Sequence, residues 1–315
     1  MKVPVRVKAK YTLEVIRPEG KDEYEFNNLV TYGLAKAMDE NNGDFNSMFF
    51  YCGVGTGSAP PAVTDTTFSG TKIADTSNGS NKTYVSGIDP NDNTRFLFTH
   101  TVRHEFSLGA VVGNVAEVAH SNITNRNRII NRALTLDSNG VPTAIPVTNQ
   151  DQLVVNYEIT VSIPLSTTFT VDIGGVSTQV DLYLAATSTS VNNITNLSQL
   201  PSVYLNGPDA TPNTRLSYGT VTPIPYPTTP NVSTGTTFQM TRLTPDVVGD
   251  GVVSGKARYS IGQANDPAGI GQISFSGASL INDSNSAWVM NFNPPVNKVD
   301  GELFEIEVSS TIVNL

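Results

Sequence analysis

The chain is poor in charged residues, in cysteine and in long apolar runs. Charged residues make up 15% of its 315 residues, against roughly 25% in an average globular protein. Lys and Arg number 19 and Asp and Glu number 28, which gives a net charge of -9. Because recognition of a phosphate backbone needs clustered Lys and Arg, this balance argues against nucleic-acid binding. A surface built from hydroxyl, amide and backbone groups is instead typical of all-β structural proteins.

The single cysteine, Cys52, excludes an intramolecular disulfide and a cysteine-based metal cluster. No window approaches the roughly 18 consecutive apolar residues of a membrane span, because the best one, 108–119, is interrupted by Gly and Asn. The N-terminal segment alternates basic with apolar residues and lacks the continuous apolar stretch of a signal peptide. We therefore expect a soluble chain without a cleavable signal and without membrane insertion.

Alternation of apolar with polar residues predicts strands through most of the chain. It is clearest over 3–15, 96–106 and 153–163, where every second residue is apolar, aromatic or His. Further strands are expected at 49–52, 168–173, 179–185, 237–243, 256–261, 272–276, 288–292 and 303–313. An Asn139-Gly140 pair between alternating residues predicts a hairpin turn.

One short helix is expected at 28–38, with Asn27 and Asn28 as candidate caps and 41–43 as its end. The predicted fold is therefore mainly β, with two β-sandwich-like domains at 1–165 and 166–315. The helix belongs to the first of them.

The second half echoes the first, which favours an internal duplication without requiring it. Three aromatic landmarks recur in the same order, at shifts of 147 to 153 residues. The pairs are Tyr51 and Tyr204, Phe106 and Tyr259, and Tyr157 and Phe304. A duplication predicts that each half buries its own core.

The glycine-rich run that contains Gly53, Gly55 and Gly57 resembles a phosphate-binding loop only superficially. Such a loop needs a Lys and a following helix N-terminus, whereas Ala59, Pro60 and Pro61 follow here. The sequence predicts a surface turn.

The three histidines, His100, His104 and His120, are expected to be exposed or half-buried on strands. His100 and His104 are four residues apart, about 13 Å along a strand, so they cannot bind one metal ion without a third element between them. Cys52 lies in an apolar strand without a nearby His, which predicts a buried, inert thiol.

Carboxylate pairs occur on predicted strands, where we expect them to point outward. They are Glu105 with Glu117 and Glu305 with Glu307. The loop 89–94 lacks the glycine of a calcium-binding loop, so calcium there, or near Asp246 and Asp250, is the less favoured alternative. We expect no catalytic, cofactor or metal site.

Four segments follow one another over about half the chain, 25–165: NNLVTYGLAKAM, FFYCGVGTGSAPPAVTDTTF, RHEFSLGAVVGNVAEVA and RALTLDSNGVPTAIPVTNQDQLVVNYEITVSIPL. Their order resembles that in virion structural proteins of tailed bacteriophages. The glycine run leads through prolines to Asp65-Thr66, and Arg132-Ala133-Leu134 leads into the Asn-Gly turn. The second half contains only loose echoes of this pattern.

The resemblance implies a non-enzymatic structural component of the virion, assembled in the host cytoplasm. It implies an adaptor in the tail, neck or fibre apparatus that binds copies of itself, as a trimer or hexamer, and other virion proteins. Because loops project from sandwiches, the candidate interface residues are Gly53, Gly55, Gly57, Pro60, Asn139 and Gly140.

Three alternatives stay open. One is a receptor-binding module for host glycans, which predicts exposed rings among Tyr204, Tyr218, Tyr226 and Trp288. Another is a capsid decoration protein, which differs only in its place on the particle. A glycan-cleaving enzyme is disfavoured, because no carboxylate pair in a groove is evident.

Overall fold

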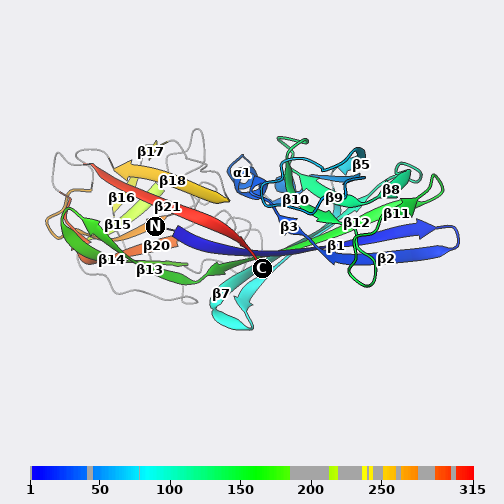
Figure 1. The fold of residues 1–315 in the computed structure, drawn as a ribbon. Helices are drawn as coiled ribbons and strands as arrows, with labels where there is room; N and C mark the ends of the chain where they lie inside the picture. Colours follow the sequence, from blue (N-terminus) through cyan, green and yellow to red (C-terminus); the bar gives the residue numbers. More distant parts are fainter. Residues whose placement is uncertain are drawn as a thin grey trace.

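The computed structural model describes residues 2–40, 45–77, 79–184, 213–218, 236–239, 241–243, 251–259, 264–275, 288–298 and 303–315. The protein is mainly β, as predicted, with several antiparallel sheets and little helix. Figure 1 shows two lobes side by side: one contains the five-stranded sheet described below and the other contains the six-stranded sheet. Among the described residues, neither helix is long and apolar enough to cross a membrane.

An eight-stranded sheet, the long sheet, runs through both lobes (Figure 1). Its order is β17-β18-β21-β1-β12-β7-β6, and β2 also pairs with β1. The strands are β1 (Lys2–Arg17), β2 (Gly20–Asn27), β6 (Ser80–Asp89), β7 (Asp92–Glu105), β12 (Gln152–Pro164), β17 (Thr241–Leu243), β18 (Val252–Tyr259) and β21 (Phe304–Asn314).

The first lobe is completed by a five-stranded sheet of order β3-β10-β9-β4-β5 and by a two-stranded sheet, β11-β8. The strands are β3 (Leu29–Val30), β4 (Tyr51–Gly55), β5 (Lys72–Ser77), β8 (Gly113–Val115), β9 (Glu117–Ser121), β10 (Ile129–Leu134) and β11 (Ile145–Val147). Helices α1 (Gly33–Glu40) and α2 (Phe45–Met48) lie between β3 and β4 in the chain.

The second lobe is built around a six-stranded sheet of order β13-β14-β20-β19-β15-β16. The strands are β13 (Ser166–Ile173), β14 (Val176–Leu184), β15 (Asn213–Tyr218), β16 (Thr236–Gln239), β19 (Ile270–Phe275) and β20 (Trp288–Val296).

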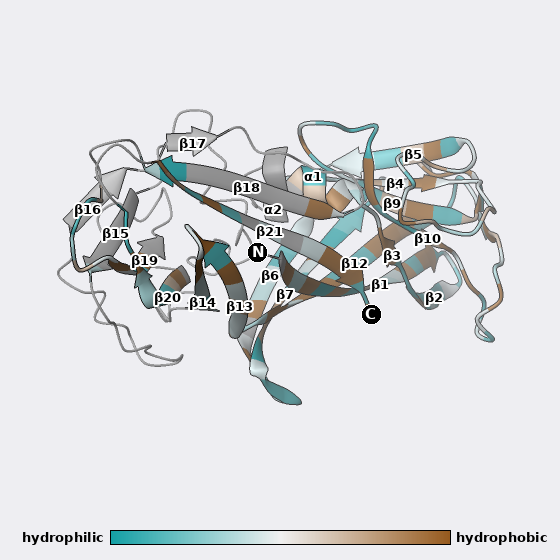
Figure 2. Cartoon of the chain, turned by 60° about the vertical axis from the view of Figure 1, so that its left-hand side comes forward, coloured by the Kyte–Doolittle hydropathy of each residue, from teal (hydrophilic) through white to brown (hydrophobic). Residues whose placement is uncertain are grey.

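The inner face of the long sheet forms the core. Along β1 the odd-numbered residues from Val3 to Val15 are buried, whereas the side chains of Arg6 and Lys8 are exposed. Apolar and polar segments alternate in the same way in Figure 2. Burying one Val or Leu side chain contributes about 1.5–3 kcal/mol, so this alternation determines which face of the sheet turns inward.

The two ends of the chain are neighbours in the long sheet. Strand β21 pairs in parallel with β1, from Lys2 opposite Ser309 to Val7 opposite Asn314. The long sheet therefore crosses the expected boundary between residues 165 and 166. The buried residues of both lobes also form one connected core cluster, so the expectation that each half buries its own core is wrong.

The order of strands in the long sheet agrees with the order of the repeated aromatic residues. The pairing register of these aromatic residues, however, differs between the two halves. On one side of β1, β12 pairs with β7, and on the other side β21 pairs with β18. However, Tyr157 lies opposite Val102, whereas its counterpart Phe304 lies opposite Tyr259. Tyr204 lies outside the described residues, so the first landmark pair remains a prediction.

The helix starts later than predicted. Asn27 ends β2, and the backbone N–H of Asn28 donates to the carbonyl of Ala9, so both candidate caps continue the sheet. The side-chain hydroxyl of Thr31 instead accepts from the N–H of Gly33 at 3.2 Å, which is the usual contact of an N-cap residue. Continued strand pairing competes with the N-cap geometry of a helix at the same residue. Here the pairing with β1 extends to Asn28, so the helix begins further along the chain.

Candidate functional site

A buried ion pair joins two neighbouring strands of the five-stranded sheet. Glu117 begins β9 and Arg132 lies on β10, and the register places them diagonally on one face of the pair. Nε of Arg132 donates to a carboxylate oxygen of Glu117 at 2.8 Å. The two side chains are only 1% and 0% exposed. Because removing a charge from water costs several kcal/mol, such a pair persists only when further hydrogen bonds satisfy both groups.

Glu117 obtains those hydrogen bonds from residues 56–71, which we call the closing loop. The backbone N–H groups of Gly57, Ser69 and Gly70 donate to its carboxylate at 2.8, 3.0 and 2.9 Å. The Ser69 hydroxyl adds a contact of 3.1 Å. Burial alone would raise the pKa of Glu117, but the amides of Ser69 and Gly70 and the Arg132 guanidinium lower it below its ordinary value. The carboxylate is therefore charged at neutral pH.

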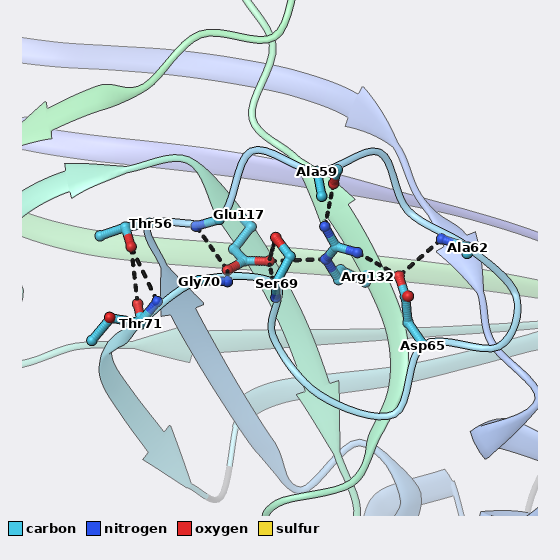
Figure 3. Close-up of polar contacts among 10 residues, drawn as sticks. Thr56, Ala59, Ala62, Asp65, Ser69, Gly70, Thr71, Glu117 and Arg132 are labelled. Carbon is cyan, nitrogen blue, oxygen red and sulfur yellow. Dashed lines mark hydrogen bonds and ion pairs between the residues drawn. The ribbon is translucent and has the colours of Figure 1, made fainter.

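Arg132 holds the other part of the closing loop (Figure 3). Its two terminal nitrogens donate to the carboxylate of Asp65 and to the backbone carbonyl of Ala59. Asp65 in turn accepts from the N–H of Ala62 at 2.8 Å. One guanidinium thus contacts β9 and two separate points of the loop, which fixes the path of the loop over the sheet.

Two glycines allow this close approach. A Cβ atom on Gly57 would lie 2.0 Å from the Ser69 hydroxyl oxygen, and one on Gly70 would lie 2.5 Å from the backbone nitrogen of Gly57. Both distances are far inside van der Waals contact, so the loop could not close in its present form with a side chain at either position.

Gly57→Ala and Gly70→Ala are each expected to lower the free energy of unfolding by about 1–3 kcal/mol, because overpacking displaces the loop from Glu117. Gly70→Ala should be the more harmful, since its obstacle is backbone. Urea unfolding measures both changes. Gly87→Ala is the matched control, because a Cβ there has open space around it; an equal loss in all three variants would contradict the packing argument.

The structure separates the predicted interface residues into buried and exposed ones. Gly53 and Gly55 lie in β4, and both are buried, as is Gly57. The prediction of a surface turn is therefore wrong at Gly53 and Gly55, because β4 is paired on both sides, with β9 and with β5. Gly57 does lie in a loop, but the loop is buried there against Glu117. Pro60 is exposed on the closing loop.

Asn139 and Gly140 lie at an exposed turn, as predicted. The carboxylate of Asp137 accepts from the N–H of Asn139 at 2.8 Å and from that of Val141 at 2.9 Å. The two sides of the turn are joined by an isolated β-bridge, Leu136 with Pro142, and by backbone hydrogen bonds from the N–H of Asp137 to the carbonyl of Val141 and from the N–H of Thr143 to the carbonyl of Thr135. The Asp137 side chain and these backbone contacts together hold the turn. Contact of this turn or of Pro60 with a partner stays a prediction.

All three histidines are fully buried, so the expectation of exposed or half-buried rings is wrong. His100 and His104 lie on the inner face of β7, and His120 lies on β9 of the facing sheet. The rings of His104 and His120 have centroids 5.0 Å apart, and His100 stacks on Tyr84 at 4.7 Å. The alternation of β7 correctly places His100 and His104 on one face of the strand. That face is buried because the five-stranded sheet packs against it.

A tyrosine links the histidines to the long sheet. The Tyr11 hydroxyl donates to the side-chain oxygen of Asn131 at 2.6 Å and lies 2.7 Å from Nδ1 of His120. Since the hydroxyl proton goes to Asn131, Nδ1 of His120 carries the proton of that second contact. Burial lowers the pKa of His104 to about 4 and lowers that of His120 well below its ordinary value. Both rings are neutral at pH 7.

The remaining candidate residues form no reactive arrangement among the described residues. Cys52 is buried, as predicted, and burial raises its pKa, so the thiol is protonated and inaccessible to solvent. Glu105 is exposed at the end of β7, whereas Glu117 is buried, contrary to the prediction that both point outward. Glu305 and Glu307 are exposed on β21. In the described part of the chain, no group of three potential metal ligands comes together.

Of the four aromatic residues expected for a glycan site, one side chain can be placed. Tyr218 is half-buried and packs against the core. Trp288 begins β20, and Tyr204 and Tyr226 lie outside the described residues, as do Asp246 and Asp250.

Sequence reasoning did not predict that Glu117, Arg132 and Asp65 meet in a buried cluster, although a signal was present. Glu117 interrupts the apolar run Val115 to Ala119, and Arg132 interrupts Ile129 to Leu134. A charged residue inside such a run is expected to be paired if the strand is buried on both faces. Comparisons of the chain with protein-family models, with curated proteins and with solved structures gave no match.

Proposed function

We propose that the chain is a non-enzymatic structural component of a bacteriophage particle, an oligomeric adaptor in the tail, neck or fibre apparatus. The resemblance of residues 25–165 to virion structural proteins supports the phage assignment. The observation that carries the adaptor role is the long sheet, which runs through both lobes without a break. An adaptor must hold two binding surfaces at a fixed distance, and a continuous hydrogen-bonded sheet does so better than two domains on a linker.

The closing loop fits the same role. Its backbone is held by a buried carboxylate and a buried guanidinium, so it presents the exposed Pro60 on a fixed path. Loops that form contacts lose less conformational entropy on assembly when they are already ordered. This arrangement favours a preformed contact surface over a reactive site, because every charged group in it is satisfied by the protein itself.

The proposal is tested by the mass of the purified protein in solution, measured by light scattering over a range of concentrations. A trimer or hexamer is the expected result, and the protein is expected in a fixed number of copies per particle in purified phage. A monomer at all concentrations, together with absence from purified particles, would overturn the proposal. Labelling its position on the particle separates a tail adaptor from a capsid decoration protein.

Glycan binding is the second candidate, because the long sheet carries a polar groove of about 390 Å³ on its outer face. Hydroxyl, amide and charged groups line it, among them Thr12, Asn156 and Glu158. The ring of its one aromatic residue, Tyr157, is buried among the core residues, so no stacking platform is available there. Saturable binding of purified host-surface oligosaccharides to the isolated protein would favour this candidate over the adaptor.

A further inference from the structure

The outer face of the long sheet has a charge gradient along β1. Its outward-facing side chains run from Arg6, Lys8 and Lys10 to Thr12 and Glu14. The neighbouring strand β2 continues the acidic end, because Glu25 lies opposite Thr12 and Glu23 lies opposite Glu14. The exposed Arg6 and Lys8 thus lie at one end of this face, and its glutamates gather toward the other.

The two ends differ in how far their charges are neutralised. In the described part of the chain, Arg6 and Lys8 form no ion pair, and both are exposed. Their end also contains Arg95, which is buried and bonded to Ser162, and Asp92 at the tip of the β6–β7 hairpin. The basic end therefore carries two exposed cations that form no ion pair, and Asp92 is the carboxylate that acts on Arg6 electrostatically.

The acidic end has the opposite excess. Five carboxylates at this end are paired with three cations, and each cation contacts two of the carboxylates. The carboxylates are Glu14, Glu23, Glu25, Glu105 and Glu158, and the cations are Lys10, Lys21 and Arg103. Glu23 and Glu25 are the most exposed of them, at 53% and 62%. Five carboxylates against three cations leave the acidic end with an excess of two negative charges.

From this gradient we propose that the outer face of the long sheet binds the same face of a second copy around a two-fold axis. The axis lies in the plane of the interface and crosses β1 at Lys10. It brings Lys8 of each copy to the level of Glu25 of the other, and Arg6 to the level of Glu23. Lys8 and Thr12 lie two residues on either side of Lys10, and Glu25 is the cross-strand neighbour of Thr12. Arg6 and Glu14 lie four residues on either side of Lys10, and Glu23 is the cross-strand neighbour of Glu14.

The geometry of the sheet allows these contacts. Strand β2 is adjacent to β1, so the facing charges are offset sideways by one strand, about 4.8 Å, which the side chains of Lys and Arg can bridge. Three strands, β1, β12 and β7, over about twelve residues each, together with the eight residues of β2, cover about 700 Å², close to the roughly 800 Å² that each partner contributes to a stable interface. Uncharged polar residues occupy much of the rest of the face, including Thr12, Thr99, Asn156 and Thr160.

The inference deepens the proposed self-association, because it names the surface and its symmetry. A two-fold face gives an even number of copies: a dimer, or the hexamer rather than the trimer of the two forms expected from the resemblance. Attraction between exposed charges is screened by salt, so dissociation should rise as the salt concentration is increased.

The test is a charge exchange, read by light scattering and sedimentation. Arg6→Glu with Lys8→Glu, and separately Glu23→Lys with Glu25→Lys, are each expected to raise the dissociation constant of the pair at least about a hundredfold, because like charges then face one another. Mixing the two double variants should restore pairing as a heterodimer. Combining all four substitutions in one chain should restore the homodimer.

Lys36→Glu is the matched control, because Lys36 is exposed on α1, outside this face; it should leave the association unchanged. Circular dichroism and urea unfolding establish that every variant is folded. Failure of the mixture and of the fourfold variant to restore pairing would overturn the inference. So would a trimer whose mass none of these substitutions changes, an outcome that leaves the proposed adaptor function standing.

Discussion

Arg132→Met is expected to lower the free energy of unfolding by about 3–5 kcal/mol, because it leaves the buried carboxylate of Glu117 without its opposite charge. The closing loop loses two anchors at the same time, the contacts of Arg132 with Asp65 and with the carbonyl of Ala59. Urea unfolding measures the loss of stability. Limited proteolysis should show the second effect, since cleavage within 56–71 becomes faster while the rest of the chain stays protected.

Arg126→Met is the matched control for this prediction. Arg126 also pairs with a carboxylate, that of Asp75, but its side chain is 54% exposed. Exposed pairs contribute about 1 kcal/mol or less, and the contact of Arg126 with the Tyr51 ring is also on the surface. Equal, small losses in the two variants would show that the Glu117–Arg132 pair does not hold the loop.

The stability of the protein is expected to fall by about 3 kcal/mol between pH 6.5 and pH 4, because His104 is buried in its neutral form. Its pKa in the folded protein is about 4, whereas the ordinary value is 6.5. Above pH 6.5 the ring is neutral in both states and the full stability is present. As the pH falls from 6.5 to about 4, only the unfolded chain takes up the proton, so unfolding becomes more favourable. His120, whose pKa is also lowered by burial, should add to the loss.

The measurement is the urea midpoint at a series of pH values, for the wild type and for His104→Gln. The variant removes one titrating ring, so its stability should depend less steeply on pH between 4.5 and 6.5, whatever its stability at pH 7. Carboxylates with lowered pKa values, such as Glu117 and Asp75, lose their contribution below this interval. Identical slopes for the wild type and His104→Gln would contradict the assignment of the pH dependence to His104.

Much of the secondary structure could be predicted from residue patterns, because alternation is a local property. The expected strand at 153–163 corresponds to β12, and that at 96–106 to most of β7. The alternation did not predict where tertiary pairing divides an expected strand. The expected single strand at 237–243 is divided, with β16 in the six-stranded sheet and β17 in the long sheet. No local pattern distinguishes a strand that continues from one that changes sheets.

The candidate site was less predictable than the strands. The glycines, the prolines and Asp65-Thr66 drew attention as a sequence pattern, and the structure brings Gly57 and Asp65 to one buried ion pair. Glu117 and Arg132 lie 48 to 67 residues from the loop positions Ser69 and Asp65 that they bind. Only folding of the sheet reveals those partners, so the sequence indicated that the loop mattered without showing what holds it.

The sequence by itself determined the class of fold and the two faces of each long strand, since side chains alternate between the faces with a period of two. It also determined the low charge of the surface and the basic start of β1. The tertiary structure alone decided that β21 lies beside β1, that the second sheet covers the histidines, and that Glu117 meets Arg132. These outcomes depend on contacts between residues far apart in the chain, whose energies arise only when water is removed between two packed sheets.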